Sequence, residues 1–214
     1  MRSILFVNGR IDDLSVLRNL VRDDDYLVAA DAGALHCLAL DRRPHVVVGD
    51  LDSLAPAIVQ ELAAQGTIFE RHPSAKDQTD LELAIERAIA DGADEILLVG
   101  ASGGRLDQAL GNLLLLAQRE WKATLKVLDG NQIAQLLRGG QQLTFHDQIG
   151  ATLSILPLSA VVTGITYHGM AYPLNNASLH LGSTRGISNQ IIASPASVTI
   201  ESGVLVVVWG ISTA

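Results

Sequence analysis

The sequence predicts an α/β fold in its first part and a β-sandwich in its second. Over residues 1–130, short runs of branched apolar residues alternate with amphipathic stretches of helical period, the pattern of βαβ units around a parallel sheet. After Gly130 the helical period stops, and short apolar runs follow one another between Gly, Pro, Asn and Ser. We therefore expect two domains, a Rossmann-like parallel-sheet domain at residues 1–130 and a β-sandwich at residues 131–214.

The first part contains six predicted strands, at residues 4–7, 26–30, 46–48, 67–69, 96–99 and 125–128. Between them, helices are predicted at residues 14–21, 58–64, 81–90 and 106–118. In the third helix, Leu81, Ile85 and Ala88 recur on one face, with Glu82 and Glu86 on another. Strands that alternate with helices predict a parallel sheet covered by helices on both faces.

The second part contains eight predicted strands and no long helix. They are residues 133–137, 142–145, 152–156, 161–163, 165–168, 178–181, 198–200 and 204–209. Close spacing with turn residues between the runs predicts a sandwich or small barrel of short strands.

Composition and charge narrow the class of protein. Of 214 residues, 48% are apolar and 18% charged, which is typical of a globular chain. The net charge of −8 argues against a nucleic-acid surface, which needs clustered Lys and Arg, although an acidic chain can bind polyphosphates that metal ions screen. No apolar run approaches the roughly 18 residues of a membrane span, and no signal-peptide pattern opens the chain. We therefore expect a cytoplasmic protein without a nucleic-acid or membrane partner.

Two smaller features have structural interpretations. The single cysteine, Cys37, cannot form an internal disulfide and lies in the apolar, helix-like stretch 34–40, so we expect it in the core. The acidic run at residues 23–25 is expected to form a solvated turn before the second strand.

Two carboxylates follow the third strand. If the backbone stays extended after Val48, Asp50 and Asp52 point the same way, and paired carboxylates suit Mg²⁺. The alternative is that Asp52 or Ser53 caps the next helix.

A second cluster, Lys76-Asp77-Gln78-Thr79-Asp80, precedes the helix at residues 81–90. A lysine with acids in one loop suits a metal–phosphate site. The alternative is that Thr79 or Asp77 caps the helix.

Two further clusters follow strands 96–99 and 26–30. In residues 100–108, the glycines permit close approach of phosphate, and Arg105 can bind phosphate oxygens with two hydrogen bonds. The stretch matches neither the Walker loop nor the dinucleotide fingerprint. Asp31 and Gly33 follow the second strand. Because ligands of parallel sheets bind at the carboxyl ends of strands, four such clusters predict one site.

Taken in order, these clusters resemble the motifs of the thiamine pyrophosphokinase family. The matching segments are Ala30-Asp31-x-Gly33, Gly49-Asp50-x-Asp52-Ser53, Lys76-Asp77-x-Thr79-Asp80 and Gly104-Arg105-x-Asp107-Gln108, with Gly169-Met170-Ala171-Tyr172-Pro173-Leu174 and Gly186-Ile187-Ser188-Asn189 in the second part. The resemblance spans nearly the whole chain. Two departures, Ala32 in place of a frequent glycine and Leu35 in place of a frequent asparagine, leave the role of the Asp31 loop open.

The resemblance implies an enzyme that transfers diphosphate from ATP to the hydroxyl of thiamine, giving thiamine diphosphate and AMP. The first domain would bind metal and nucleotide, and the second would bind thiamine, in a homodimer whose active site lies between subunits. Mg²⁺ would be held by Asp50, Asp52 and Asp80, which with Arg105 would be catalytic. The ATP side would comprise Asp31, Lys76, Thr79, Gly104, Arg105, Asp107 and Gln108, and the thiamine side Tyr172, Ser188 and Asn189.

The chemistry itself requires mainly charge neutralisation and positioning around the β-phosphorus of ATP, which the thiamine hydroxyl attacks. One clustered aspartate could orient or deprotonate that hydroxyl, and the sequence leaves open which one. Three alternatives remain at this level. The D-x-D at residues 50–52 also occurs in phosphatases that form an aspartyl phosphate. A pyrophosphokinase could act on another alcohol, such as a hydroxymethylpterin. A non-enzymatic ATP sensor would need no acceptor pocket.

Overall fold

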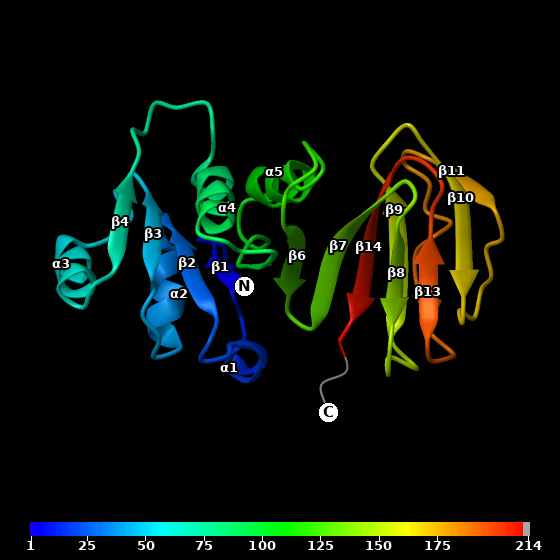
Figure 1. The fold of residues 1–214 in the computed structure, drawn as a ribbon, viewed down its shortest axis with the longest axis horizontal. Coiled ribbons are helices and arrows are strands. Elements are labelled where there is room, and N and C mark those ends of the chain that lie inside the picture. Colours follow the sequence, from blue (N-terminus) through cyan, green and yellow to red (C-terminus); the bar gives the residue numbers. More distant parts are fainter. Residues whose placement is uncertain (212–214) are drawn as a thin grey trace. The chain divides into compact units, whose positions relative to one another are not determined.

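The computed structural model describes residues 1–211, and the chain divides into two compact units, Met1–Gly130 and Asn131–Ala214 (Figure 1). The last three residues of the predicted sandwich domain lie outside the described residues. Among residues 1–211, no helix combines the length and apolar character needed to cross a membrane.

The first unit is built on a parallel sheet with the strand order β6-β5-β1-β2-β3-β4. Its strands are β1 (Arg2–Phe6), β2 (Tyr26–Ala30), β3 (Val46–Gly49), β4 (Ile68–Arg71), β5 (Glu95–Val99) and β6 (Thr124–Asp129). The inner strands are continuous apolar runs, as sequence predicts, because helices cover both faces of the sheet. All four residues of β3 are buried.

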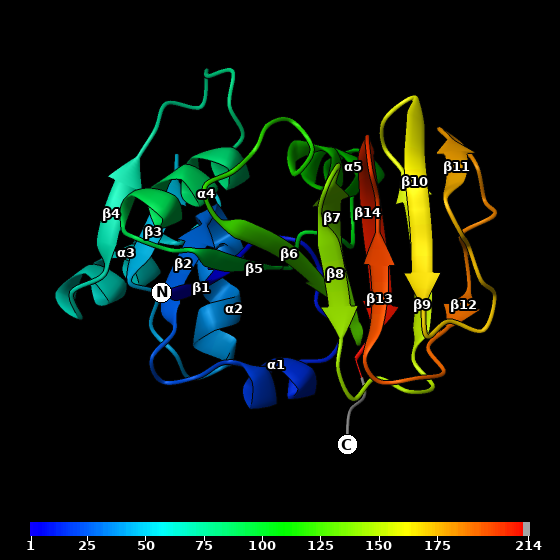
Figure 2. The ribbon, with the colours of Figure 1, turned by 45° about the vertical axis from the view of Figure 1, so that its right-hand side comes forward.

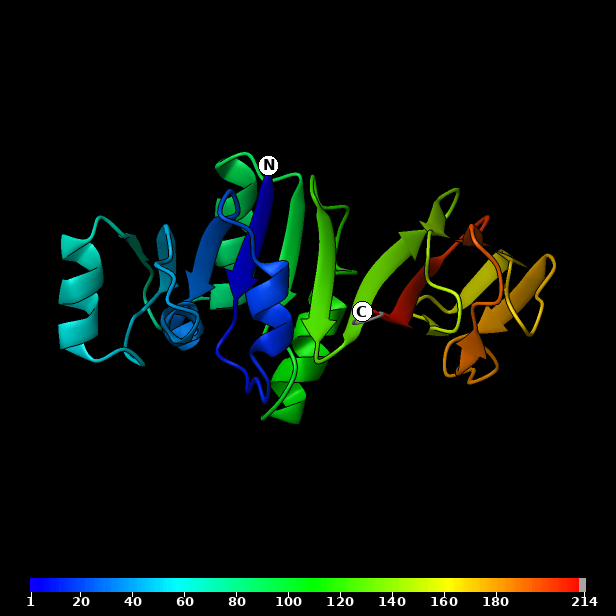
Figure 3. The ribbon, with the colours of Figure 1, turned by 90° about the horizontal axis from the view of Figure 1, so that it is seen from below.

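The helices of this unit are α1 (Ser15–Leu20), the short 3-10 helix η1 (Asp31–Gly33), α2 (Ala34–Ala39), α3 (Pro56–Ala64), α4 (Asp80–Ala90) and α5 (Leu106–Leu115). Helix α2 packs on β1 and β2, and α4 packs on β1, β2 and β3 from the other face (Figure 3). The chain moves outward from β1 to β4 and then returns through α4 to β5 on the far side of β1. The strand order therefore reverses between β1 and β5, the place where open parallel sheets bind ligands.

The second unit contains two antiparallel sheets, with neighbouring strands β12-β9-β14-β7 in one and β11-β10-β13-β8 in the other. The sheets lie face to face (Figure 2). The strands are β7 (Gln132–Arg138), β8 (Gln142–Phe145), β9 (Thr152–Pro157), β10 (Val161–His168), β11 (Ala177–His180), β12 (Asn189–Gln190), β13 (Ala196–Thr199) and β14 (Val204–Gly210). Their inner side chains form one apolar core, in which the rings of Phe145 and Trp209 meet edge to face, 5.3 Å between centroids.

The predicted fold class is confirmed, with local corrections. Residues 161–163 and 165–168, predicted as two strands, form the single strand β10, whose pairing shifts register around Gly164. A β-bulge explains why the apolar pattern is interrupted there. The two-residue strand β12 is too short for its pattern to be recognised.

The acidic run before β2 is the other correction. Asp25 is 4% exposed, and its carboxylate accepts two hydrogen bonds from the Arg2 guanidinium, at 2.7 and 2.6 Å. Only Asp23 and Asp24 are exposed, as a solvated turn requires. Burial alone raises the pKa of Asp25, but the hydrogen bonds from Arg2 and from the Arg22 N–H outweigh it and lower the pKa below its ordinary value.

Candidate active site

Three carboxylates meet at the carboxyl ends of β2 and β3. Asp31 follows β2, Asp50 follows β3, and Asp80 is the first residue of α4. Asp31 Oδ1 accepts a hydrogen bond from the Leu51 N–H at 3.1 Å. Burial, together with a hydrogen bond from Asp80 and the charges of Asp80 and Asp50, raises the pKa of Asp31 to about 6, although the hydrogen bond from the Leu51 N–H acts in the opposite direction. We call Asp31, Asp50 and Asp80 the carboxylate cluster.

The backbone after β3 turns rather than staying extended, so the expected alternation of Asp50 and Asp52 is wrong. Leu51 has φ 66°, in the left-handed region. Asp50 Oδ1 accepts from the Asp52 N–H at 3.1 Å, and Asp52 Oδ1 accepts from Ser53 Oγ at 2.9 Å. The side chain of Ser74 and the Asp52 N–H lower the pKa of Asp50.

The capping alternative for this segment is also wrong. Helix α3 begins at Pro56 with Ala55 as its N-cap, and no side chain caps it. Proline at the first helical position needs no cap for its missing N–H. The polar side chains of residues 50–53 are therefore not used to cap α3.

In the loop before α4, the structure separates two roles. Thr79 caps the helix by accepting the Glu82 N–H at 3.2 Å, so the capping alternative is confirmed for this residue. Lys76 Nζ lies 2.9 Å from Asp80 Oδ1 and donates to the Pro73 carbonyl at 3.0 Å. The lysine therefore brings a positive charge to the edge of the carboxylate cluster.

The glycine-rich loop before α5 presents its polar side chains to solvent. Arg105 pairs with Asp107, Nε to Oδ1 at 3.1 Å and Nη2 to Oδ2 at 2.5 Å, and both side chains are largely exposed. Gly104 has φ +87°, a conformation that glycine favours, with open space around it. Gln108 is also exposed. No described contact joins these side chains to the carboxylate cluster.

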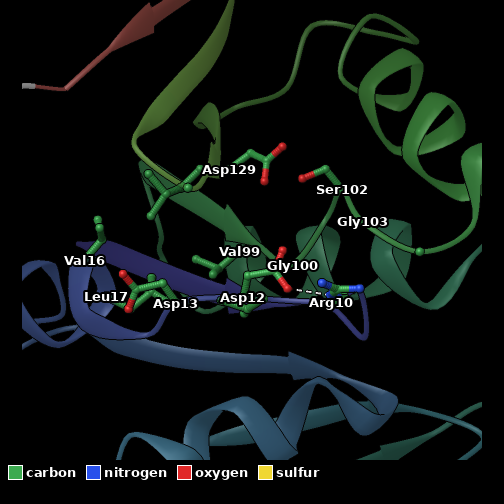
Figure 4. Close-up of a pocket in the computed structure, with 14 residues that line it drawn as sticks. Arg10, Asp12, Asp13, Val16, Leu17, Val99, Gly100, Ser102, Gly103 and Asp129 are labelled. Carbon is green, nitrogen blue, oxygen red and sulfur yellow. Dashed lines mark hydrogen bonds and ion pairs between the residues drawn. The ribbon is translucent and has the colours of Figure 1, made fainter.

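A pocket of about 470 Å³ lies where the strand order reverses, at the carboxyl ends of β1, β5 and β6 (Figure 4). Its polar side chains are those of Arg10, Asp12, Asp13, Ser102 and Asp129. Figure 4 shows Arg10 and Asp12 in contact, with Arg10 Nε donating to Asp12 Oδ1 at 2.5 Å.

The walls of this switch-point pocket are formed by two loops in close contact. The Gly9 N–H donates to the Gly100 carbonyl at 2.9 Å, and a Cβ on Gly9 would overlap the Gly100 and Ser102 carbonyls. His36 Nε2 lies 2.8 Å from the Gly9 carbonyl. Sequence reasoning singled out residues 100–108 but missed Gly9 and the loop residues Arg10, Asp12 and Asp13, which line the same pocket or contact its wall. The switch-point rule would have indicated them, but it needs the strand order, which no local pattern supplies.

The second unit has a pocket of about 440 Å³ that contains all three residues predicted for the thiamine side. It is lined by Tyr167, Tyr172, Pro173, Leu174, Arg185, Ile187, Ser188 and Asn189. The side chain of Tyr172 is 70% exposed, so it is not a core residue of the sandwich. We call this the acceptor pocket.

Asn189 fixes the backbone beneath Tyr172. Its Oδ1 accepts from the Tyr172 N–H at 3.0 Å and the Gln190 N–H at 2.8 Å, and its Nδ2 donates to the Tyr172 carbonyl at 2.8 Å. Ser188 has φ 61°, and its N–H donates to Ser154 Oγ at 3.0 Å. The amide of Asn189 is thus mainly occupied within the protein.

The donor set of the carboxylate cluster fits Mg²⁺. Within residues 1–211, no three His, Cys, Asp or Glu side chains are arranged to hold a metal ion unaided. Mg²⁺ does not require such a set, because it is commonly held by one or two carboxylates together with waters and substrate phosphates. Three carboxylates beside the single ammonium of Lys76 leave the excess negative charge that a divalent cation would balance.

Comparison with known families decides the identity of the chain. The family model described as "Thiamin pyrophosphokinase, catalytic domain" matches residues 17–128, and the one described as "Thiamin pyrophosphokinase, vitamin B1 binding domain" matches residues 141–205. The chain belongs to the thiamine pyrophosphokinase family. Membership confirms the predicted family and enzyme class, and it decides against the phosphatase interpretation of residues 50–52.

Individual thiamine pyrophosphokinases agree with this assignment. The thiamine pyrophosphokinase of Bacillus subtilis is 30% identical over 182 residues, 85% of each chain. The crystal structure of a B. subtilis thiamine pyrophosphokinase aligns with a TM-score of 0.87 at 27% identity, covering 99% of this chain and 100% of that one. The structure from Geobacillus thermodenitrificans aligns with a TM-score of 0.84 at 30% identity, covering 100% and 99%.

The two thiamine pyrophosphokinase matches fall on the two sites described above. The catalytic-domain match contains the whole carboxylate cluster together with Lys76 and Arg105. The vitamin B1 binding match contains the whole acceptor pocket.

Proposed function

We propose that this chain catalyses Mg²⁺-dependent transfer of diphosphate from ATP to the hydroxyl of thiamine, producing thiamine diphosphate and AMP. The observation that carries the proposal is the carboxylate cluster at the ends of β2 and β3, inside the segment that matches the family's catalytic domain. The relatives of this chain that are named thiamine pyrophosphokinase support thiamine as the acceptor.

In this proposal, Asp50, Asp52 and Asp80 supply the protein's ligands to Mg²⁺, and waters and the phosphate oxygens of ATP complete its coordination. When bound, the ion supplies positive charge that neutralises the phosphate oxygens. Asp31 positions these ligands, because it accepts a hydrogen bond from the Leu51 N–H and so fixes the turn that carries Asp50 and Asp52. Lys76, 2.9 Å from Asp80, is placed to neutralise a phosphate oxygen at the same edge, and Thr79 orients α4 by capping it.

The glycine-rich loop would bind the phosphate chain. Within residues 1–211, the Arg105 side chain pairs with the exposed Asp107, and exchanging this partner for phosphate costs little, because exposed ion pairs contribute little to stability. Gly104 leaves room for close approach, and Asp107 and Gln108 stand beside it in the first turn of α5. The nucleoside would occupy the switch-point pocket, which lies against the same loop.

Thiamine would occupy the acceptor pocket. Its cationic thiazolium ring is suited to the exposed aromatic face of Tyr172, which can contribute apolar contact and cation–π attraction. Ser188 lines the same pocket, and Asn189 sets the position of Tyr172 through three hydrogen bonds. The residues of this pocket thus bind and orient the acceptor, while those of the first unit bind the donor.

We further propose that the active enzyme is a homodimer whose active site combines residues of both subunits. The large exposed fractions of Tyr172 and Ile187, 70% and 45%, support it, because these apolar walls remain open to solvent in the single chain. Catalysis then depends mainly on holding the thiamine hydroxyl in line with the β-phosphorus and on excluding water.

The proposal is tested by incubating the purified protein with ATP, Mg²⁺ and thiamine and measuring nucleotides and thiamine diphosphate together. AMP and thiamine diphosphate in equal amounts are expected. Formation of ADP, or of AMP without thiamine diphosphate, would contradict it. A parallel reaction with a hydroxymethylpterin tests the alternative acceptor, and ATP binding without turnover of either acceptor would favour a sensor.

A further inference from the structure

Tyr167 lines the acceptor pocket and carries a buried hydroxyl. The residue lies on β10, where its N–H donates to the Leu174 carbonyl at 3.0 Å, and it lines the pocket together with Tyr172. Only 9% of the residue is exposed. Its hydroxyl oxygen is buried and has no hydrogen-bond partner within the described part of the chain, residues 1–211.

Packing of the sandwich core does not require this hydroxyl. Phenylalanine would fill the same space, and a buried polar group without a partner is unfavourable in the folded state. Burial also raises the pKa of Tyr167, so the group remains a neutral phenol that can both donate and accept a hydrogen bond. Buried hydroxyls without a partner are uncommon in folded proteins, so this group calls for a partner, which a bound ligand can supply.

We propose that Tyr167 is a specificity-determining residue of the acceptor pocket, whose hydroxyl forms a hydrogen bond with the aminopyrimidine ring of bound thiamine. The inference rests on the proposed function and extends it to a residue outside the predicted site. The inference depends on the burial of this hydroxyl and on the place of Tyr167 in the pocket lining, and neither observation involves stacking on Tyr172.

Few groups of thiamine could form this hydrogen bond with the Tyr167 hydroxyl. The thiazolium ring has a sulfur and a quaternary nitrogen, which form no strong hydrogen bonds, and the hydroxyethyl oxygen must reach the phosphorus. The ring nitrogens and amino group of the pyrimidine remain. The outer wall of the pocket includes Tyr172 and Ile187, exposed side chains that can move without unpacking the core. In the proposal, movement of these side chains gives a planar heteroaromatic ring access to the buried Tyr167 hydroxyl.

The test compares Tyr167→Phe with the wild-type protein in the full chain. The ligand-free variant should melt at the same temperature or higher, because it loses only an unpaired hydroxyl. Its thiamine Kd by calorimetry and its thiamine KM should rise about fivefold to tenfold, a usual effect of one lost hydrogen bond, with the ATP KM unchanged. Tyr26→Phe is the matched control, because the Tyr26 hydroxyl donates to Asp91 at 2.6 Å in the first unit, and thiamine binding should not change.

A second ligand isolates the contact. A thiamine analogue with benzene in place of the aminopyrimidine should bind the wild type and Tyr167→Phe equally, since it cannot pair with the hydroxyl. Unaltered thiamine affinity in Tyr167→Phe would overturn the inference and would mean that the hydroxyl binds only a buried water. A lower melting temperature with both KM values raised alike would overturn it too, as a packing role.

Failure of the proposed function would give other results than failure of the Tyr167 inference. If the wild type forms no thiamine diphosphate and binds no thiamine, both proposals fall. If the wild type is active and Tyr172→Ala raises the thiamine KM while Tyr167→Phe does not, only the Tyr167 inference fails.

Discussion

The carboxylate of Asp31 occupies the space that a side chain at position 49 would fill. A Cβ built on Gly49 would overlap Asp31 Oδ1, so the ends of β2 and β3 approach each other only because residue 49 is glycine. This approach sets the Asp31 carboxylate 3.1 Å from the Leu51 N–H and beside Asp50.

Gly49→Ala should therefore displace Asp31 and the turn that follows β3. We expect kcat to fall about a hundredfold, the usual effect of a misplacement near 1 Å in an active site. Steady-state kinetics with a thermal melt checks this. Gly111→Ala is the control, because Gly111 lies in α5 with open space around it, and it should leave kcat unchanged. Full activity in Gly49→Ala would contradict a role for the Asp31 contact.

Removing charge from the predicted metal ligands should abolish turnover without unfolding the protein. Asp50→Asn and Asp52→Asn should each lower kcat by two or more orders of magnitude, because positioning and charge neutralisation dominate this chemistry. Melting temperatures should hardly change, since these side chains lie on a surface turn outside the core. Asp24→Asn, on an exposed turn, serves as the control. Near-normal activity of the double variant would remove Asp50 and Asp52 from the metal site.

Tyr172 should affect the acceptor and not the nucleotide. Loss of its ring removes an interaction of roughly 1–2 kcal/mol, so Tyr172→Ala should raise the thiamine KM about tenfold with the ATP KM unchanged. Tyr172→Trp should be tolerated, because the ring face carries the interaction. The measurement is both KM values beside a thermal melt. A destabilised protein with unchanged preference between substrates would exclude stacking.

A site shared between subunits predicts complementation. Asp50→Asn and Tyr172→Ala each damage every site of their own homodimers, but a mixed dimer contains one intact site. Refolding the two variants together should restore roughly a quarter of wild-type activity at limiting thiamine, from random pairing of subunits. Activity no higher than the sum of the separate variants, or a fully active monomer in sedimentation, would contradict the shared site.

The buried pair of Asp25 and Arg2 predicts how stability depends on pH. Because folding lowers the Asp25 pKa, its contribution is present above the unfolded value of about 3.9 and is lost as pH falls through the folded value. Asp25→Asn should cost roughly 3 kcal/mol at pH 7 and flatten the fall of stability between about pH 5 and pH 2. Urea unfolding across that range measures it, with Asp24→Asn as control. Parallel pH profiles would mean that Asp25 does not contribute to acid sensitivity.

Local patterns were sufficient to predict the fold class and the position of most elements. Helix α4 was predicted from its apolar spacing, and β3 from an uninterrupted run of valines. The spacing of Gly, Asp and Lys after the strands was sufficient to indicate the family, because these residues are adjacent in the chain and their order survives without the fold.

The three-dimensional relationships of the site came only from the structure. The switch-point pocket depends on the strand order, in which the chain leaves β4 at one edge and returns to pair β5 with β1. This pairing joins segments that are far apart in the sequence. Likewise, the approach of Asp31 to Leu51, the amide contacts of Asn189 with Tyr172 and the unpaired hydroxyl of Tyr167 depend on packing between distant segments. The spacing of apolar residues indicates which side of a helix or strand faces the core. The sequence by itself therefore determined the helices and strands and the chemical character of the site. Only tertiary packing decided which of these side chains meet and which remain free to bind a ligand.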